Sequence, residues 1–496
     1  MKLNNYTNTP SFNGITKIYA MTDSHQETRK TCCLLSKVLT DSKGAKNILF
    51  LNCGDIYKGI YPRELERSAY LKMKQSNPDI EMVMTLGNND FGFNQENLNY
   101  LIDTIKEFKS KGIQTVCANI FTKEGKRPDW VKPYTVVERD GNRTFVTGFC
   151  IDNINTSKFG IIPKKQTEVL SEIKQAILEE KPDNVVILNH NHLPASKSLV
   201  QECKDRDIPV DVLIGGHDHE YVPPIPSLNI YYPKAFSNSI YRMSLENKDG
   251  LKTLKDVEAI ENQGLKMLPV FEKDIVRYEK ESGLMNKIAP AVLNLDKKYS
   301  HPSSLGSFLA DEMKRVSDSD IGFFSTGFLM YPMRYTPNGF ITNYSFKKTI
   351  IAETPIKIVE LNSKELKEVF NNAMMLNGYS VANPKFLQCS NNIKLCGRDN
   401  PDLKKWEVKQ IFINDEPILD ENAEPINLSK KYKCAIDSYI ADGGQGFGVI
   451  KEVEKKEVVK NGEPVKINSV LLEALKEAPK KYPIGLEYPS FEICEI

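Results

Sequence analysis

The stretch 213–219 reads Leu-Ile-Gly-Gly-His-Asp-His, so an apolar run ends in two glycines and then presents two imidazoles one residue apart. The chain has only six histidines in 496 residues. Five of them come just after apolar, β-branched runs, namely His25, His190, His192, His217 and His219. Imidazoles collected just beyond apparent strands are typical of metal ligands, so this pattern predicts a metal site.

The length of 496 residues exceeds what one core usually holds and predicts two domains. Sixty-six basic against 65 acidic residues leave a net charge of +1, so no global charge draws the chain to a nucleic-acid polymer or a membrane. No signal peptide or membrane span is visible. Ten scattered cysteines without a CxxC pair predict reduced thiols in a cytoplasmic protein, or a periplasmic or extracellular one if a precursor segment was removed.

Short apolar segments alternate with amphipathic ones along the first half of the chain. The first predicted strands and helices, in order, cover residues 15–21, 27–40, 47–51, 63–75 and 81–86. Such alternation predicts an α/β fold, with strands buried between helix layers. Ligands of α/β sheets bind beyond the carboxyl ends of the strands, which is where the histidine motifs fall.

Oxygen and nitrogen donors follow five of these predicted strands. The candidate metal ligands are Asp23, His25, Asp55, Asn88, His190, His217 and His219. They are enough for two ions that share one carboxylate. Mixed nitrogen and oxygen ligands suit Mn²⁺ or Zn²⁺, with Fe²⁺ or Co²⁺ also possible. Two such ions side by side can clamp the oxygens of a phosphoryl displacement, which points to a phosphoester hydrolase.

The ordered series DSH, GD, GNND, NHNH and GHDH resembles the calcineurin-like metallophosphoesterases, and the whole chain looks like their 5'-nucleotidase and cyclic-phosphodiesterase branch. The resemblance implies an N-terminal four-layer α/β/β/α sandwich and a C-terminal α+β domain of the 5'-nucleotidase type. It implies that Asp23, His25, Asp55 and His219 hold one ion. It also implies that Asp55, Asn88, His190 and His217 hold the other.

The domain limits expected from this resemblance are residues 1–262 for the metallophosphoesterase domain and 301–496 for the substrate-binding domain. Residues 263–300 form the expected linker, and the amphipathic pattern at 270–295 predicts a long helix within it.

One departure from the family concerns catalysis. The family pairs a histidine after the GN motif with an aspartate three residues later, and this chain has Asn89 and Gly92 there. Asn89 can donate a hydrogen bond to a phosphoryl oxygen but cannot deliver a proton near neutral pH. His192 is a candidate replacement, with a solvated loop residue as the alternative reading. Asp90, next to Asn89, reads as structural.

The C-terminal half carries further matches to the family. Residues 304–311 and 437–447 resemble its motifs, and the resemblance places a nucleobase clamp at Phe386 and Phe447. Ordinary core packing is the alternative for both rings. The family's substrate-contacting arginine is missing, and Arg334, several residues later, is either a displaced substitute or an ordinary surface residue.

These observations predict a dimetal hydrolase that releases phosphate from a nucleotide by attack of a metal-bridging hydroxide, as in nucleotide catabolism. Two alternatives remain open. One is a phosphodiesterase or 2',3'-cyclic nucleotide hydrolase on the same scaffold. The other is a weakly active nucleotide-binding protein, because Asn89 and Gly92 replace the catalytic pair.

Overall fold

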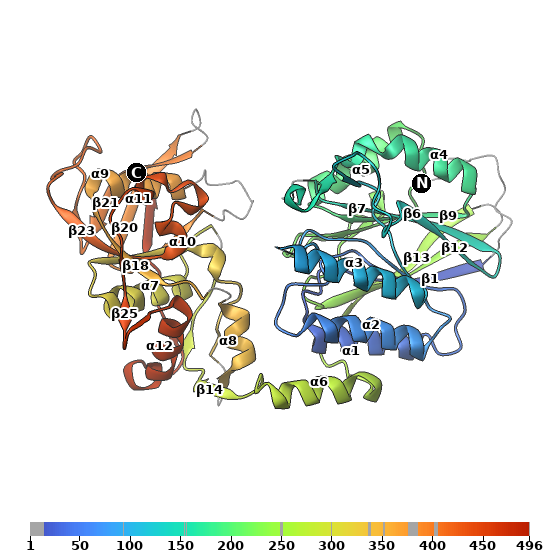
Figure 1. The fold of residues 1–496 in the computed structure, drawn as a ribbon, viewed down its shortest axis with the longest axis horizontal. Coiled ribbons are helices and arrows are strands. Elements are labelled where there is room, and N and C mark those ends of the chain that lie inside the picture. Colours follow the sequence, from blue (N-terminus) through green and yellow to red (C-terminus); the bar gives the residue numbers. More distant parts are fainter. Residues whose placement is uncertain are drawn as a thin grey trace. The chain divides into compact units, whose positions relative to one another are not determined.

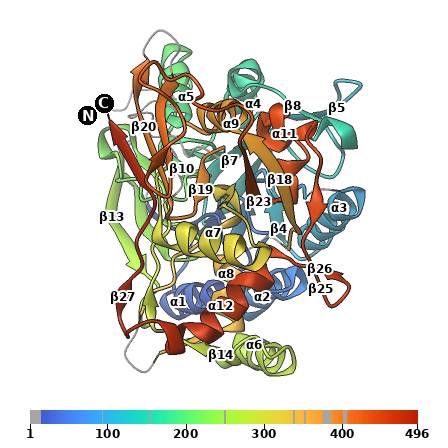
Figure 2. The same ribbon diagram turned by 90° about the vertical axis from the view of Figure 1, so that its left-hand side faces the viewer.

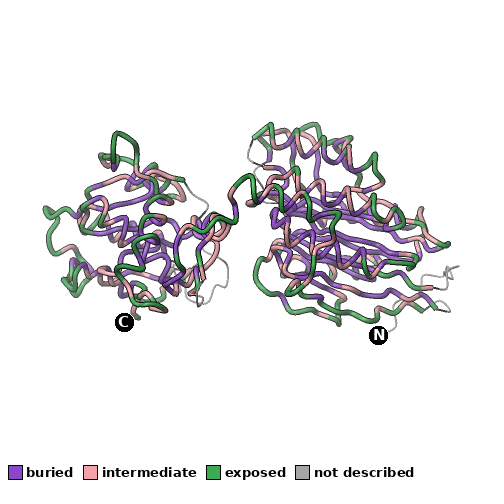
Figure 3. The backbone as a smooth tube through the Cα atoms, turned by 90° about the horizontal axis from the view of Figure 1, so that it is seen from below, coloured by how far each residue is buried: buried purple, intermediate pink, exposed green. Residues whose placement is uncertain are grey.

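The structure is a computed structural model, and it describes residues 14–92, 94–152, 154, 156–248, 251–298, 300–335, 339–350, 353–374, 385–400 and 405–495. The chain divides into two compact units, Met1–Tyr278 and Glu279–Ile496. Each unit is built around its own buried strands (Figure 3).

Two sheets form the centre of the N-terminal unit. The first has six strands in the order β13 (Leu251–Glu261), β12 (Ser239–Lys248), β1 (Gly14–Met21), β2 (Ile48–Asn52), β3 (Glu81–Met84) and β4 (Ile113–Thr115). The second has five strands in the order β11 (Ile230–Tyr231), β10 (Val212–Gly216), β9 (Asn184–His190), β7 (Asn142–Cys150) and β6 (Tyr134–Arg139). One apolar cluster includes Ile18 and Leu51 of the first sheet with Val146 and Leu188 of the second, so the sheets face each other across a shared core.

Helices cover the outer faces of this sandwich. They are α1 (Thr28–Asp41), α2 (Arg63–Ser76), α3 (Gln95–Ser110), α4 (Leu170–Glu180) and α5 (Leu193–Asp205). In Figure 1, α1 and α2 lie along one outer face of the unit, and α4 and α5 lie along the opposite one. The predicted four-layer α/β/β/α sandwich is therefore confirmed.

Parallel pairing aligns the strand ends that carry the candidate ligands. In the first sheet β1, β2 and β3 run parallel, with Met21 opposite Asn52 and Asn52 opposite Met84. In the second sheet β9 and β10 run parallel, with His190 opposite Gly216. The loops after these strands therefore leave each sheet at one edge, as expected for ligand sites of α/β proteins.

The C-terminal unit has an α+β fold, as predicted. Its five-stranded sheet has the order β19 (Leu387–Cys389), β16 (Ile321–Ser325), β23 (Lys431–Asp437), β18 (Ile356–Asn362) and β24 (Lys456–Glu457). Its four-stranded sheet has the order β22 (Glu416–Pro417), β21 (Lys405–Ile413), β20 (Ile393–Asn400) and β28 (Glu492–Glu495). The longer helices are α7 (Ser304–Ser317), α9 (Ser363–Ala373) and α12 (Ile467–Lys481). In Figure 2, where this unit faces the viewer, α7 and α12 pack side by side.

Shorter elements complete both units. They are β5 (Ile120–Thr122), β8 (Ile161–Pro163), β14 (Lys287–Pro290), β15 (Leu293–Asn294), β17 (Phe340–Thr342), β25 (Val459–Lys460), β26 (Glu463–Pro464), β27 (Leu486–Glu487), α8 (Asn343–Thr349), α10 (Ser438–Ala441) and α11 (Gly448–Lys451).

The linker helix is shorter than predicted. The helix expected at residues 270–295 is α6, which covers only Pro269–Glu281, and the chain then forms β14 and β15. Gly283 takes a left-handed φ of 63°, which ends a right-handed helix, and Pro290 lacks the N–H that a helix interior needs. The boundary between the two units lies inside α6. The domain limits 1–262, 263–300 and 301–496 stay a prediction.

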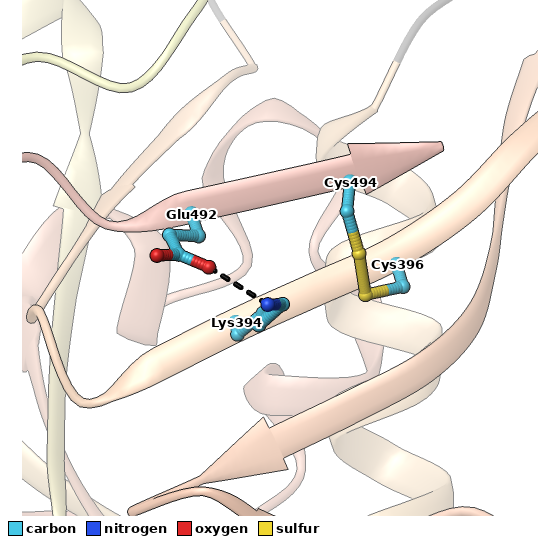
Figure 4. Close-up of a disulfide and its surroundings, with 4 residues drawn as sticks. All are labelled: Lys394, Cys396, Glu492 and Cys494. Atoms are coloured by element: carbon cyan, nitrogen blue, oxygen red, sulfur yellow. Dashed lines mark ion pairs between the residues drawn. A yellow bond between two sulfur atoms is a disulfide. The ribbon is translucent and has the colours of Figure 1, made fainter. Parts of the chain in front are cut away.

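A disulfide in the C-terminal unit corrects the expectation of reduced thiols. It joins Cys396 of β20 to Cys494 of β28, which pair in parallel register, and the ion pair of Lys394 with Glu492 lies beside it (Figure 4). The other eight cysteines are free. The two bonded cysteines are 98 residues apart in sequence, so their pairing cannot be predicted from the local spacing of cysteines.

Candidate metal centre

The predicted metal ligands lie in the loops that follow five strands of the N-terminal unit. Asp23 and His25 follow β1, Asp55 follows β2, Asn88 follows β3, His190 ends β9, and His217 and His219 follow β10. The structure brings all seven side chains to one edge of the sandwich, in two groups that share Asp55.

Four of these residues hold a backbone conformation that side chains rarely adopt. The φ angles of Asp23, His25, Asp55 and His217 are 46°, 46°, 53° and 81°. Left-handed backbone at non-glycine residues costs roughly 1–3 kcal/mol each and persists where the surroundings impose it, often at functional sites. The loops therefore hold these donors at an energetic cost.

The first group consists of Asp23, His25, Asp55 and His219, whose donor atoms all lie within 4.8 Å of one another. The Nε2 atoms of His25 and His219 are 3.0 Å apart. Asp23 Oδ1 lies 3.4 Å from His219 Nε2, and Asp55 Oδ2 lies 3.6 Å from His25 Nε2. Two imidazole nitrogens and two carboxylates that face one centre form a fitting donor set for a divalent cation.

The second group contains Asp55, His190 and His217, again with donor atoms within 4.8 Å. Asn88 completes it, because its Oδ1 lies 3.2 Å from His190 Nε2 and 2.8 Å from His217 Nδ1. Each donor set thus offers two imidazole nitrogens and at least two oxygen donors, without a thiolate. This chemistry fits a borderline divalent ion in both groups.

Hydrogen bonds outside the two groups fix the ligand atoms. His190 Nδ1 lies 2.7 Å from the carbonyl oxygen of Cys53, which turns Nε2 toward the centre. The backbone N–H of His217 donates to Asp23 Oδ2 over 3.0 Å, and Thr22 Oγ1 donates to the same oxygen over 2.6 Å. The orientation of the donors is therefore built into the chain.

Asp90 has the structural role expected for it. Its buried carboxylate accepts backbone N–H bonds of 2.8–3.1 Å from Asp55, Ile56, Tyr57 and Gly87. Asp90 thereby ties the loop after β2 to the loop after β3. Burial, with a further contribution from the charge of Asp55, raises its pKa to about 6.

The charges in the centre shift the pKa values of two histidines in opposite directions. Burial lowers the pKa of His190, but the negative charges of Asp55 and Asp23 outweigh burial and raise the pKa to about 10. Burial and the charge of His190 lower the pKa of His217 to about 4, so this ring is neutral and its lone pair is free to bind a cation. Burial would raise the pKa of Asp55, but His190 and His25 outweigh it and hold the pKa well below its usual range.

The predicted catalytic residues lie next to this centre. The side-chain amide of Asn89 donates to Asp55 Oδ2 over 2.6 Å, and its backbone N–H donates to Asp55 Oδ1 over 2.8 Å. His192 is 49% exposed, and its ring centroid lies 4.3 Å from that of His217. Sequence reasoning missed its partner Asp218, whose Oδ1 lies 2.6 Å from His192 Nδ1 and whose Oδ2 accepts the N–H of Leu193. The signal was present, since Asp218 is the middle residue of the GHDH motif.

The predicted substrate residues of the C-terminal unit differ in exposure. Phe386 and Phe447 are 2% and 1% exposed and belong to one core cluster. This burial matches the core-packing alternative for both rings, and their role as a nucleobase clamp stays a prediction. Arg334 is exposed, outside that cluster. Burial would raise the pKa of Asp296, but the hydrogen bonds from Ser304, with the charges of Lys298 and Arg334, outweigh it and lower the pKa.

Sequence reasoning also missed an aromatic pair in this unit. Phe328 is partly buried, Tyr439 is 47% exposed, and their ring centroids are 6.4 Å apart. They follow the parallel strands β16 and β23, where Ser325 Oγ donates to Gln445 Oε1 over 3.3 Å. Neither ring occupies a position at which the resemblance implies a substrate contact.

Comparison with known proteins gives this geometry a family. Residues 16–221 match the model of the calcineurin-like phosphoesterases, and residues 282–452 match that of the 5'-nucleotidase C-terminal domain. The chain belongs to the 5'-nucleotidase family of calcineurin-like phosphoesterases. It is a metal-dependent phosphoester hydrolase, and its fold implies bound divalent metal ions.

Relatives from several organisms share most of the chain. A 5'-nucleotidase of Diplobatis ommata is 22% identical over 82% of this chain and 76% of its own length. An apyrase of Tabanus yao is 24% identical over 85% of this chain and 81% of its own length. The crystal structure of a 5'-nucleotidase precursor from Thermus thermophilus has a TM-score of 0.70 at 19% identity, and the match covers 97% of this chain and 99% of that one.

The cytoplasmic location predicted from the sequence is wrong. The Cys396–Cys494 disulfide is a bond that persists in oxidising compartments and is rare in the cytosol. The similar Thermus thermophilus protein is named a precursor, the term for a chain that is processed after synthesis. The scattered cysteines misled the prediction because a long-range pair leaves no pattern. Within the described residues, no helix combines the length and hydropathy needed to cross a bilayer.

Proposed function

We propose that the N-terminal unit binds two divalent cations and that the chain hydrolyses a nucleotide phosphoester there. Asp23, His25, Asp55 and His219 would hold one cation, and Asp55, Asn88, His190 and His217 would hold the other. The observation that carries this proposal is the position of Asp55, whose carboxylate belongs to both donor groups.

The donor chemistry favours Mn²⁺ or Zn²⁺, with Fe²⁺ or Co²⁺ as further fits, because imidazole and carboxylate ligands suit these ions. Two such ions supply Lewis-acid activation of water and charge neutralisation at a phosphoryl group. The chain's own residues set the donor positions and the surroundings of that group.

Asn89 is proposed to act at the phosphoryl group and on Asp55. Its amide donates to Asp55 Oδ2 in this structure, which orients the shared carboxylate. An amide N–H also stabilises negative charge on a phosphoryl oxygen without transferring a proton.

His192 is proposed to contact the substrate from the opposite loop. Asp218 fixes the ring through Nδ1, so Nε2 is the nitrogen left for a substrate oxygen. Because Asp218 also accepts the Leu193 N–H at the start of α5, it ties the His192 loop to the His217 loop. Asp218 is a positioning residue in this proposal.

The substrate is proposed to be a nucleotide, which the names of the 5'-nucleotidase and apyrase relatives support. In the C-terminal unit, Tyr439 and Phe328 form an aromatic pair in which the Tyr439 ring is exposed, and an exposed ring can stack on a nucleobase. This pair takes the stacking role that the sequence placed on Phe386 and Phe447.

A phosphodiesterase or cyclic-nucleotide hydrolase is a second candidate, favoured by Asn89. A monoester with a poor leaving group gains ~10²–10⁴-fold from general-acid help that an amide cannot give. A diester with a better leaving group needs this help less.

The test is a substrate panel on protein loaded with Mn²⁺ or Zn²⁺. AMP, a 2',3'-cyclic nucleotide and bis-p-nitrophenyl phosphate are compared at equal metal content. Preference for AMP supports the nucleotidase, and preference for either diester supports the second candidate. Two bound ions without turnover of any ester would reject both and leave a nucleotide-binding protein. Asp211→Asn should leave the substrate preference unchanged, because Asp211 is a buried carboxylate at the opposite end of β10 that accepts the Val185 N–H.

A further inference from the structure

The segment between β11 and β12 brings an aromatic ring to the candidate metal centre. The ring centroid of Phe236 lies 5.2 Å from that of His25 and 4.9 Å from that of His219. The backbone N–H of Phe236 donates to the carbonyl oxygen of Asp23 over 2.6 Å. One residue thus contacts three of the four members of the first donor group.

The backbone here is strained. Phe236 and Ser237 have φ angles of 59° and 51° at consecutive positions. Glycine takes such angles freely, whereas a bulky residue there is a genuine outlier with a backbone cost. A phenylalanine in this place needs contacts that hold it there.

A buried chain of hydrogen bonds supplies those contacts. Ser237 Oγ lies 2.8 Å from Thr31 Oγ1 of α1, and the Thr31 hydroxyl donates to Glu66 Oε1 of α2 over 2.9 Å. All three side chains are fully buried. Asn262 adds a bond of 2.6 Å from its Nδ2 to the Ser237 carbonyl. The strained loop is therefore fastened to both helices that cover this face of the sheet.

We propose that Phe236 is a positioning residue that sets His25 and His219 for one of the two ions, and that the Ser237–Thr31–Glu66 chain holds it there. The ring meets the His219 imidazole edge-to-face at an interplanar angle of 69° and lies tilted by 33° against the His25 imidazole, and the Nε2 atoms of these two rings are 3.0 Å apart. It limits ring rotation, while the N–H bond fixes the Asp23 loop. This inference rests on the proposed dimetal function and adds a residue outside every predicted motif.

The test measures Mn²⁺ binding to Phe236→Gly by calorimetry and by electron paramagnetic resonance. Glycine relieves the backbone strain and removes the ring. We expect one of the two sites to weaken by about 10–100-fold, the range for residues that orient metal ligands, while the other keeps its affinity. The spectrum should then change from a spin-coupled pair to a single-ion signal at limiting Mn²⁺. A residue with a merely structural role would not split the two sites.

Two further variants keep the result interpretable. Lys181→Gly is the matched control, because Lys181 has a φ of 48° at the end of α4, remote from the donor groups, and should leave both sites unchanged. Ser237→Ala removes only the bond to Thr31 and should weaken the same single site by less. It decides the question if Phe236→Gly fails to fold.

The outcomes separate this inference from the function on which it rests. If the unmodified protein fails to bind two ions, the proposed function falls. If it binds two and Phe236→Gly binds both as tightly, or loses both equally, the positioning role is refuted. The same reading applies to Ser237→Ala.

Discussion

The strand-end loops of the N-terminal unit and the segment 437–447 of the C-terminal unit, which includes α10, both carry residues predicted from sequence motifs to be functional. In the first region every predicted donor reaches a common centre. In the second, Phe447 turns into the core. A buried histidine or aspartate needs a polar partner, so a cluster of them at strand ends is restricted to arrangements in which the side chains face one another or a ligand. A phenylalanine is satisfied by any apolar contact, so its motif says little about its role.

The largest expected effect tests the shared metal ligand in the N-terminal unit. Asp55→Ala removes the carboxylate that both donor groups share. Both ions should be lost together, with a drop in affinity beyond the ~10–100-fold typical of residues that only orient ligands, and hydrolysis should cease. Metal analysis after dialysis and an ester assay check this. Asp211→Asn should retain both ions, and two ions retained by Asp55→Ala would refute the shared role.

Much of the first region was predictable because its information is local. The order of donors after Met21, Asn52 and Gly216 is visible in the sequence, and parallel pairing places these ends at one edge. The four-layer sandwich followed from resemblance. The hidden parts depend on contacts between distant segments. Phe236 reaches His25 and His219 across the fold, and Asp218 reaches His192 from another loop.

The second region shows the opposite balance. The start of α9 is set locally, because Asn362 caps the helix and the Glu365 carboxylate accepts the Asn362 N–H in a capping box. The burial of Phe386 and Phe447 depends on how two sheets and α9 pack, which no short motif records. The Cys396–Cys494 bond is equally non-local. The helix predicted from the sequence was longer than α6, because the amphipathic pattern continues past the glycine that ends the helix.

The next effect tests the covalent link that the sequence did not reveal. Cys494→Ser opens a loop of 98 residues, and the chain-entropy model gives ~4–5 kcal/mol of stability for a loop of that size. We expect the urea midpoint of the C-terminal unit to fall while the ions of the N-terminal unit stay bound. Reductant should reproduce the loss in the unmodified protein. An unchanged midpoint would mean that the bond adds nothing to stability.

The variant Phe447→Ala tests whether Phe447 packs in the core or stacks on the nucleobase of the substrate. A buried phenylalanine that is truncated to alanine costs roughly 3–5 kcal/mol through lost burial and a cavity. We therefore expect a clear fall in the unfolding midpoint with little change in KM of the protein that remains folded. A raised KM for nucleotides at unchanged stability would restore the predicted clamp and erase the contrast between the two regions.

Tyr439→Ala is the complementary change. Its ring is exposed, so truncation should leave stability nearly unaffected. If the ring stacks on a base, KM for AMP should rise by the equivalent of ~1–3 kcal/mol, whereas KM for a substrate without a base should not move. Tyr439→Phe retains the ring and should behave like the unmodified protein. Equal KM values for all three proteins would remove Tyr439 from the substrate site.

The last prediction concerns the pH dependence of metal affinity, which changes by the smallest amount for each pH unit. Without metal, a pKa of about 10 keeps the proton on His190 at neutral pH, while ligation needs its Nε2 lone pair. Cation binding at the second group must therefore release that proton, and apparent affinity should rise by about tenfold per pH unit between pH ~7 and ~10. His217, with a pKa of about 4, adds nothing in this range.

The same proton gives an opposite trend in the metal-free protein. The folded pKa of His190 is raised above the ordinary 6.5, so its stabilising effect is complete below pH 6.5 and is lost as pH rises through about 10. Metal-free stability should therefore fall over the window in which metal affinity rises. Titration calorimetry with Mn²⁺ in two buffers of different ionisation enthalpy counts the released protons, and pH-dependent unfolding measures the second trend. If binding releases no proton at pH 8, the two negative charges do not hold His190 protonated, and the coupling between Asp55 and His190 is refuted.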